Sequence, residues 1–155
     1  MHYQPMQIQN FIGRCAVLLC AFLVSCAQEP ASKTPAPVTI VSTPWQFVKF
    51  QGSDDTVLKP DDKSKYTLAF SADGSVSVRL DCNRGRGAWK SSGTNQLELG
   101  PLALTRAMCA QGSLHDRFVK HWSYVRSYVI RNGHLYLSLM ADGGIYEFEP
   151  IAPTK

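Results

Sequence analysis

An unbroken apolar run near the N-terminus decides which part of this chain can fold. The run from Cys15 to Val24 reads CAVLLCAFLV, with Arg14 before it and small residues after it. At about ten residues it has half the length of a membrane-spanning helix, which needs roughly 20. It is typical of the hydrophobic region of a signal peptide, so we exclude residues 1–25 from the fold. Met1 and Met6 are both candidate start residues for this leader.

The end of the apolar run, Leu23-Val24-Ser25-Cys26, resembles the lipobox of bacterial lipoproteins. The resemblance implies that Cys26 carries a diacylglycerol thioether and becomes the N-terminus after cleavage. An ordinary secretory signal cleaved nearby is the alternative. Each buried methylene contributes about 0.8 kcal/mol, so two or three acyl chains would hold the protein on a membrane permanently. Ala27 stands where a retention signal usually has Asp, so we expect the periplasmic face of the outer membrane.

Export changes the meaning of the five cysteines. Cys15 and Cys20 leave with the leader and Cys26 takes the lipid, which leaves Cys82 and Cys109. In an oxidising compartment, such a pair predicts a disulfide. Closing a loop of about 28 residues would stabilise the fold by about 3.5 kcal/mol in the chain-entropy model. Two unrelated buried thiols are the alternative.

The segment 26–44 is predicted to be a lipidated, proline-rich tether. From Ala27 to Pro44 it holds four prolines and few large apolar groups, so it cannot bury enough surface to offset its ordering entropy. A first edge strand at Val38–Val41 remains open. Of the 16 Lys and Arg, Arg14 leaves with the leader, and against 12 Asp and Glu the mature net charge is about +3. This mild balance does not suggest a nucleic-acid partner.

Beyond Trp45, alternating apolar and polar residues predict antiparallel strands. Asp73-Gly74 and Asn132-Gly133 are strong hairpin signals between such runs. The polar stretch Gln51–Lys65 is predicted to be a solvated loop, because its two Asp pairs lack the spacing of a calcium site. The expected strands lie at 45–50, 66–70, 76–80, 88–90, 97–99, 128–130, 135–139 and 145–148.

A single helix is predicted after Ser113, which can cap it, with Asp116 at the capping-box position. Its apolar stripe recurs at helical spacing and consists of Leu114, Phe118, Trp122 and Val125, widened by Val119. We expect this stripe to pack across the sheet.

Two linked motifs carry a family resemblance. Asp81-Cys82-Asn83-Arg84-Gly85-Arg86-Gly87, followed by Leu104-Thr105-Arg106-Ala107-Met108-Cys109-Ala110, resembles the signature of META domains, the family of the heat-inducible lipoprotein HslJ. The resemblance places the domain at 45–150 and a C-terminal tail at 151–155. It implies an α+β fold in which a strongly curved, open barrel-like antiparallel β-meander packs against one α-helix. The motif residues are Asn83, Arg84, Gly87, Thr105 and Met108.

Each motif residue also has a physical interpretation. Asn83 can fold its amide onto nearby backbone, and Gly85 and Gly87 can adopt positive φ or admit a second chain segment. Met108 is expected to fill an irregular gap before the helix.

The titratable residues do not predict an enzyme. His115 and His121 are six positions apart on the helix, about 600° of turn, so they cannot be paired ligands. His134 follows a turn. We therefore predict no catalytic residues, no metal and no cofactor.

Basic residues crowd around the two cysteines and are a candidate anion-binding patch, with ordinary solvated arginines as the alternative. They are Arg79, Arg84, Arg86, Lys90 and Arg106. The family is associated with heat shock, envelope stress and drug tolerance, without an agreed activity. We therefore expect a monomeric envelope lipoprotein that binds a protein partner, in a chaperone-like or pilotin-like manner, in the groove between helix and sheet. The alternative is a lipid or amphiphile binder with an apolar cavity inside the curved sheet; an enzyme is the least favoured hypothesis.

Overall fold

The computed structural model describes residues 39–41 and 43–152. The predicted leader, the lipidation site Cys26 and the tether up to residue 38 lie outside these described residues. Within the described part, no helix is long and apolar enough to cross a bilayer.

The described residues form short antiparallel strands and one α-helix. The elements are β1 (Pro44–Gln51), β2 (Val57–Leu58), the 3-10 helix η1 (Lys63–Lys65), β3 (Tyr66–Phe70), β4 (Ser75–Leu80), β5 (Asn83–Lys90), β6 (Glu98–Leu99), β7 (Ala103–Leu104), α1 (His115–Trp122), β8 (Val125–Arg131), β9 (His134–Leu139) and β10 (Ile145–Pro150).

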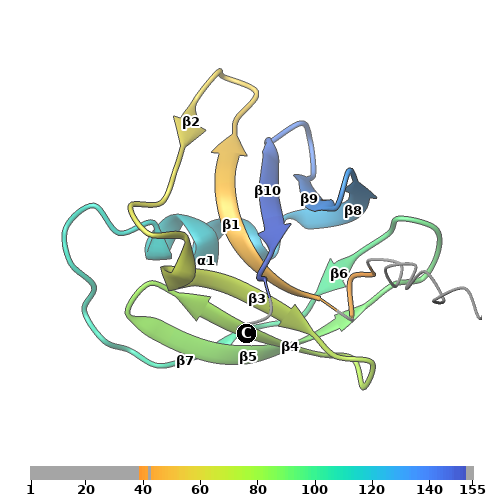
Figure 1. The fold of residues 1–155 in the computed structure, drawn as a ribbon, viewed down its shortest axis with the longest axis horizontal. Coiled ribbons are helices and arrows are strands. Elements are labelled where there is room, and N and C mark those ends of the chain that lie inside the picture. Colours follow the sequence, from red (N-terminus) through yellow and green to blue (C-terminus); the bar gives the residue numbers. More distant parts are fainter. Residues whose placement is uncertain (1–38, 42, 153–155) are drawn as a thin grey trace, which may run out of the picture. The chain divides into compact units, whose positions relative to one another are not determined.

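The strands curl into a nearly closed barrel (Figure 1). Their order is β6-β5-β4-β3-β1-β10-β9-β8, with β2 beside β1 and β7 beside β5. The two ends of this order meet, because Leu97 N–H donates to the Arg126 carbonyl at 2.9 Å and Gln96 pairs with Ser127. The prediction of a strongly curved antiparallel sheet with one α-helix is confirmed.

Both hairpin predictions are confirmed. Asn132 and Gly133 have φ of 52° and 78°, the two positive values of a type I′ turn. Gly74 has φ of 80° between β3 and β4. The predicted loop at 51–65 also contains β2 and η1, which the sequence pattern did not reveal.

The fold begins upstream of Trp45. Ile40 is only 6% exposed, and its carbonyl accepts a hydrogen bond from Trp45 Nε1 at 3.2 Å. Ile40 and Val41 lie in a turn and not in an edge strand.

Helix α1 fills the interior of the barrel. The Phe118 ring lies 4.9 Å from that of Phe47 and 4.7 Å from that of Tyr146, and the Trp122 indole donates to the Gly100 carbonyl at 2.8 Å. The space left around this aromatic cluster is a cavity of about 10 Å³, about the volume that one water probe sphere occupies. The apolar cavity that the alternative of lipid binding requires is therefore not present in this interior.

The helix is shorter than predicted. It begins at His115 and ends at Trp122, so Val125 is the first residue of β8, although its side chain is buried as expected. Ser113 Oγ accepts from His115 N–H at 3.2 Å, but Asp116 bonds to the His115 ring and does not complete a capping box. Val119, expected to widen the buried stripe, is 40% exposed.

A short strand was predicted at 88–90, with residues 83–87 outside it. The predicted start was wrong, because β5 begins at Asn83 and includes residues 83–87. The reason is a close crossing: the chain at 100–104 runs against β5 at Gly85 and Gly87. A Cβ on Gly85 would overlap the Ala103 carbonyl oxygen, and one on Gly87 would lie 3.1 Å from the Pro101 oxygen. Neither glycine has positive φ, so close approach is the reason for both.

We predict that Gly85→Ala lowers the free energy of unfolding by about 1–3 kcal/mol or more, because the added methyl group meets backbone that cannot move aside. Urea unfolding followed by circular dichroism measures this. Gly93→Ala is the control: its Cβ meets nothing nearer than a Gln96 side chain at 3.5 Å, so a change within about 0.5 kcal/mol is expected. Equal effects of the two substitutions would refute the crossing argument.

Candidate functional site

The disulfide and Asn83 fasten the chain before the helix to β5. Cys82 and Cys109 are bonded, with Cα atoms 5.4 Å apart, so the predicted disulfide is confirmed. Asn83 is 1% exposed. Its Nδ2 donates to the Ala107 carbonyl at 2.9 Å, and its Oδ1 accepts from Ala107 N–H at 2.8 Å. The side-chain amide thus pairs with Ala107 as a neighbouring strand would, which is the folding-back that the sequence predicted.

Thr105 completes this junction. Its hydroxyl donates to Asn83 Oδ1 at 2.9 Å and accepts from Arg84 N–H at 3.0 Å. Its backbone N–H donates to the Arg84 carbonyl at 2.9 Å. The buried Asn83 amide thus has hydrogen bonds to both Ala107 and the Thr105 hydroxyl. Loss of one of these bonds would leave a buried polar group unsatisfied, at a cost of about 1–3 kcal/mol.

A surface groove of about 680 Å³ lies beside this junction. It runs between the segment after β7 and the first half of α1. Its lining residues are Asn83, Leu102, Ala103, Leu104, Thr105, Arg106, Ala107, Met108, His115 and Val119. Most of them are apolar, so the groove can exclude water from an apolar side chain.

Met108 does not fill a gap in the core, contrary to expectation. Its side chain is 99% exposed at the rim of the groove. The backbone explains this: Ala107 is tied to Asn83 and Cys109 to Cys82, which leaves Met108 between two fixed points with its side chain in solvent. Together with the apolar lining of the groove, Met108 makes a continuous apolar surface of the kind that marks interaction sites.

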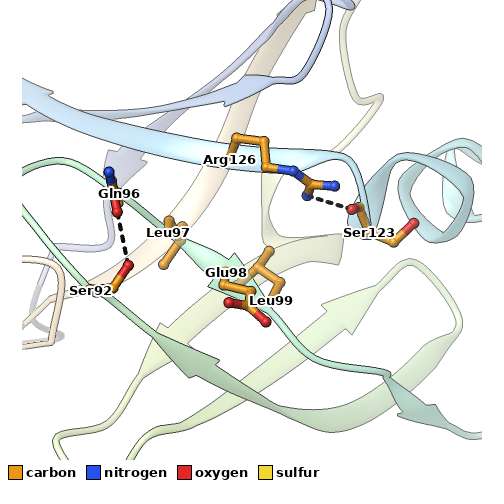
Figure 2. A pocket seen from close by; sticks show the side chains of 7 residues that line it. All are labelled: Ser92, Gln96, Leu97, Glu98, Leu99, Ser123 and Arg126. Carbon is orange, nitrogen blue, oxygen red and sulfur yellow. Dashed lines mark hydrogen bonds between the residues drawn. The ribbon is translucent and has the colours of Figure 1, made fainter.

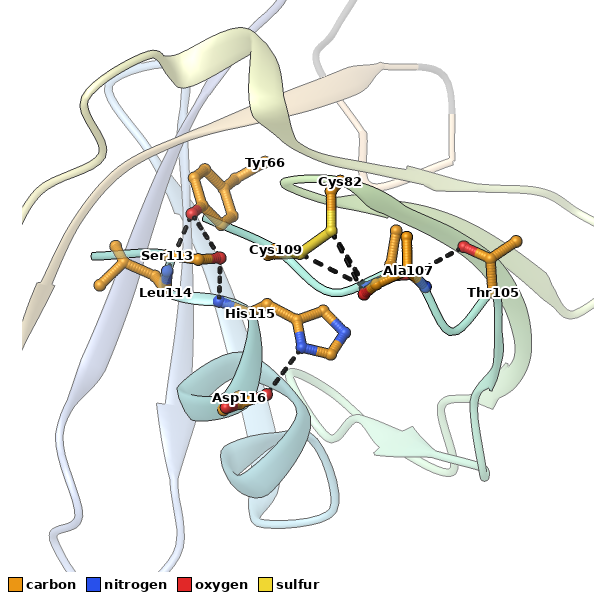
Figure 3. A network of polar contacts seen from close by, with 10 residues as sticks. Tyr66, Cys82, Thr105, Ala107, Cys109, Ser113, Leu114, His115 and Asp116 are labelled. Carbon is orange, nitrogen blue, oxygen red and sulfur yellow. Dashed lines mark hydrogen bonds and ion pairs between the residues drawn. A yellow bond between two sulfur atoms is a disulfide. The ribbon is translucent and has the colours of Figure 1, made fainter. Parts of the chain in front are cut away.

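His115 also lines the groove. Its Nδ1 lies 2.9 Å from Asp116 Oδ1, while its Nε2 is buried and has no hydrogen-bond partner in the described part of the chain. Figure 3 shows the ring on the side of the helix start that faces Ala107. The Tyr66 hydroxyl holds the helix start in place, since it accepts from Leu114 N–H at 2.9 Å. No sequence pattern predicts that His115 lines the groove, because this depends on which segment lies opposite the ring.

The predicted anion-binding patch is only partly assembled. Arg79, Arg84 and Arg86 share the outer face of neighbouring strands, because Arg79 pairs with Arg84 and Arg86 lies two residues along β5. Lys90 forms an ion pair with Glu98 at 3.1 Å, and Arg106 lines the groove. Three of the five basic residues therefore form one basic face.

A second pocket of about 570 Å³ lies at the seam where β6 meets β8 (Figure 2). Its polar groups mostly serve the fold. Arg126 donates to the carbonyls of Ser123 and Val125 at 2.7 and 2.8 Å, and Ser92 donates to Gln96 at 2.8 Å. Leu97 and Leu99 turn into the core. The groove beside the disulfide is therefore the better candidate for binding.

His115, His121 and His134 lie apart from one another. His121 Nδ1 lies 2.9 Å from the Tyr146 hydroxyl, and His134 Nδ1 lies 2.8 Å from Glu147. Among residues 39–41 and 43–152, no group of three or more His, Cys, Asp or Glu could hold a metal ion.

These features define a small, disulfide-closed β-barrel whose interior is filled by one helix and whose candidate groove lies outside the barrel. A model of the META domain matches residues 38–151, and the chain belongs to the META domain family.

Two solved structures share the fold. An NMR structure of a protein from Burkholderia xenovorans has a TM-score of 0.61 and 20% identity, over 81% of this chain and 99% of its own. A crystal structure of a DUF4847 family protein from Bacteroides vulgatus has a TM-score of 0.53 and 15% identity, over 71% of this chain and 93% of its own. At these identities the likeness extends to the fold alone. None of the curated proteins compared with the chain matches it.

The half-buried His121 predicts a pH dependence of stability. Burial lowers its pKa below the ordinary 6.5, and the Arg117 and Lys120 charges lower it further, while burial raises the pKa of Tyr146, its hydrogen-bond partner. The folded state thus binds fewer protons than the unfolded state, so stability is lost as the pH falls below about 6.5.

We predict that His121→Gln reduces this loss, measured by urea unfolding at about pH 7.5 and about pH 5. His134→Gln is the comparison substitution, because this ring bonds to Glu147 and its loss should leave the His121–Tyr146 contribution in place. An identical pH dependence in wild type and His121→Gln would contradict the assignment.

Proposed function

We propose that this META-domain chain is a non-catalytic lipoprotein of the bacterial cell envelope, which supports envelope integrity or stress and drug tolerance by binding another envelope protein. The leader and Cys26 support the location, since they resemble an export signal with a lipobox. The Cys82–Cys109 disulfide agrees with it, because disulfides persist in oxidising compartments.

The groove beside the disulfide supports binding. Met108, 99% exposed at its rim, is the observation that carries the proposal, because it extends the apolar lining of the groove into one continuous surface, and such surfaces mark interaction sites. The barrel interior is packed, which disfavours the alternative of an amphiphile held inside the sheet. The site therefore differs from the space between helix and sheet that the sequence suggested, which Phe118 and Trp122 fill.

A non-catalytic role agrees with the side-chain geometry. In the described part, the histidine rings bond to Asp116, Tyr146 and Glu147, and no ring bonds to a serine, threonine or cysteine side chain. A base in contact with a nucleophile is the usual arrangement for covalent catalysis.

Photo-crosslinking in cells tests the proposal. With benzoylphenylalanine at position 108, we expect a discrete adduct with one envelope protein, and no such adduct from position 129, an exposed apolar residue on β8. Val119→Asp should remove the adduct, because it places a charge in the apolar groove. Cys26→Ala should remove both acyl labelling and the adduct. Identical adducts from positions 108 and 129 would contradict the site.

A further inference from the structure

The backbone between Leu104 and Met108 is bonded on one side only. Thr105 N–H donates to Arg84, and the N–H and carbonyl of Ala107 both pair with the Asn83 amide. Within the part of the chain that the structure describes, the backbone N–H and carbonyl groups of Arg106 and Met108 have no hydrogen-bond partner. In an extended chain, successive residues direct these groups to opposite sides. The outward groups of Arg106 and Met108 thus form the open edge of a strand.

The same alternation extends to Leu104. Arg84 and Thr105 are hydrogen bonded to each other. Bonded and non-bonded pairs alternate along an antiparallel ladder, so the next pair, Gly85 and Leu104, is of the non-bonded kind. Leu104 thus directs its backbone groups away from β5, in line with those of Arg106 and Met108.

This edge lacks the features by which proteins usually block strand edges. The short strand β2, for comparison, is followed by Lys59 and Pro60 and preceded by Asp54 and Asp55. Prolines and charges of this kind prevent unwanted pairing. Between Leu104 and Met108 there is no proline and no carboxylate, and Arg106 is the single charge.

The groove lies along this open edge. It is lined by the same residues, with Leu102, Leu104 and Val119 supplying apolar surface and His115 a buried nitrogen without a partner. An added strand would meet unpaired backbone groups and an apolar channel for alternate side chains. A lipid chain would fill the channel but leave the backbone groups unpaired, at a cost in free energy.

We propose that the segment Leu104–Met108 accepts an extended strand of a partner polypeptide, which pairs with the outward backbone groups and places alternate apolar side chains in the groove. This mode, strand addition, takes its affinity from main-chain hydrogen bonds and its specificity from the side-chain channel. The inference rests on the proposed function, a protein-binding role, and adds how the partner is recognised.

The test starts from a random heptapeptide library selected against the full chain in detergent. The peptide with the greatest enrichment is synthesised twice, once unmodified and once with alternate backbone amides N-methylated, which removes donors and keeps every side chain. We expect the unmodified peptide to shift the NMR amide signals of Leu104, Arg106 and Met108. N-methylation on the pairing side should weaken binding about tenfold or more, since it removes main-chain hydrogen bonds.

A matched pair of variants tests the protein side of the contact. Arg106→Pro removes the outward N–H, whereas Arg106→Ala keeps it and removes the charge. We expect Arg106→Pro to weaken binding about tenfold or more and Arg106→Ala to change it less than about threefold. If Arg106→Pro fails to fold, the N-methylated peptide still decides between the alternatives.

The outcomes separate the two proposals. A peptide that shifts the groove signals but tolerates N-methylation would overturn strand pairing and leave protein binding intact. Enrichment of no peptide, or binding away from the groove, would overturn both. Shifts of Arg106 and Met108 that depend on the concentration of the chain alone would show pairing with a second copy, which also overturns the partner strand.

Discussion

The pairing of the Asn83 amide with Ala107 is the interaction on which the surface of this domain depends. It replaces the neighbouring strand that β5 would otherwise need at its first residue, and it lies directly beside the Cys82–Cys109 bond. The two links act at adjacent residues, one covalent and one polar. Together they hold the segment before the helix against the barrel, so that segment stays ordered while its outer side faces solvent.

The helix determines where binding can occur. Phe118 and Trp122 occupy the barrel interior, and the cavity that remains is about 10 Å³. A fold of this shape can in principle hold a lipid in its centre, but here aromatic side chains fill that volume. The features left for recognition lie outside: the groove beside the disulfide, the exposed Met108 at its rim, and the basic face of Arg79, Arg84 and Arg86.

The elements that sequence reasoning predicted are those set by local chemistry. The Asn132-Gly133 turn follows from the backbone preference of its two residues, and the helix around Phe118 follows from apolar periodicity. The disulfide follows from the number of cysteines left after the predicted export. The start of β5 was missed because the glycine-rich stretch 84–87 has the composition of a loop. The crossing chain at 100–104, which requires a glycine at position 85, is distant in sequence. Val125 was assigned to the helix because its position fits helical spacing as well as the strand that follows. The exposure of Met108 depends on two tertiary links, which no local pattern contains.

The central claim is that Asn83 holds an ordered strand segment with one open side, and residue-resolved hydrogen exchange of the native full chain tests it most directly. The account predicts slow exchange of the Ala107 amide, which is bonded to Asn83, beside fast exchange of the Arg106 and Met108 amides, which face solvent. Equal protection of all three amides, or equal absence of protection, would contradict it.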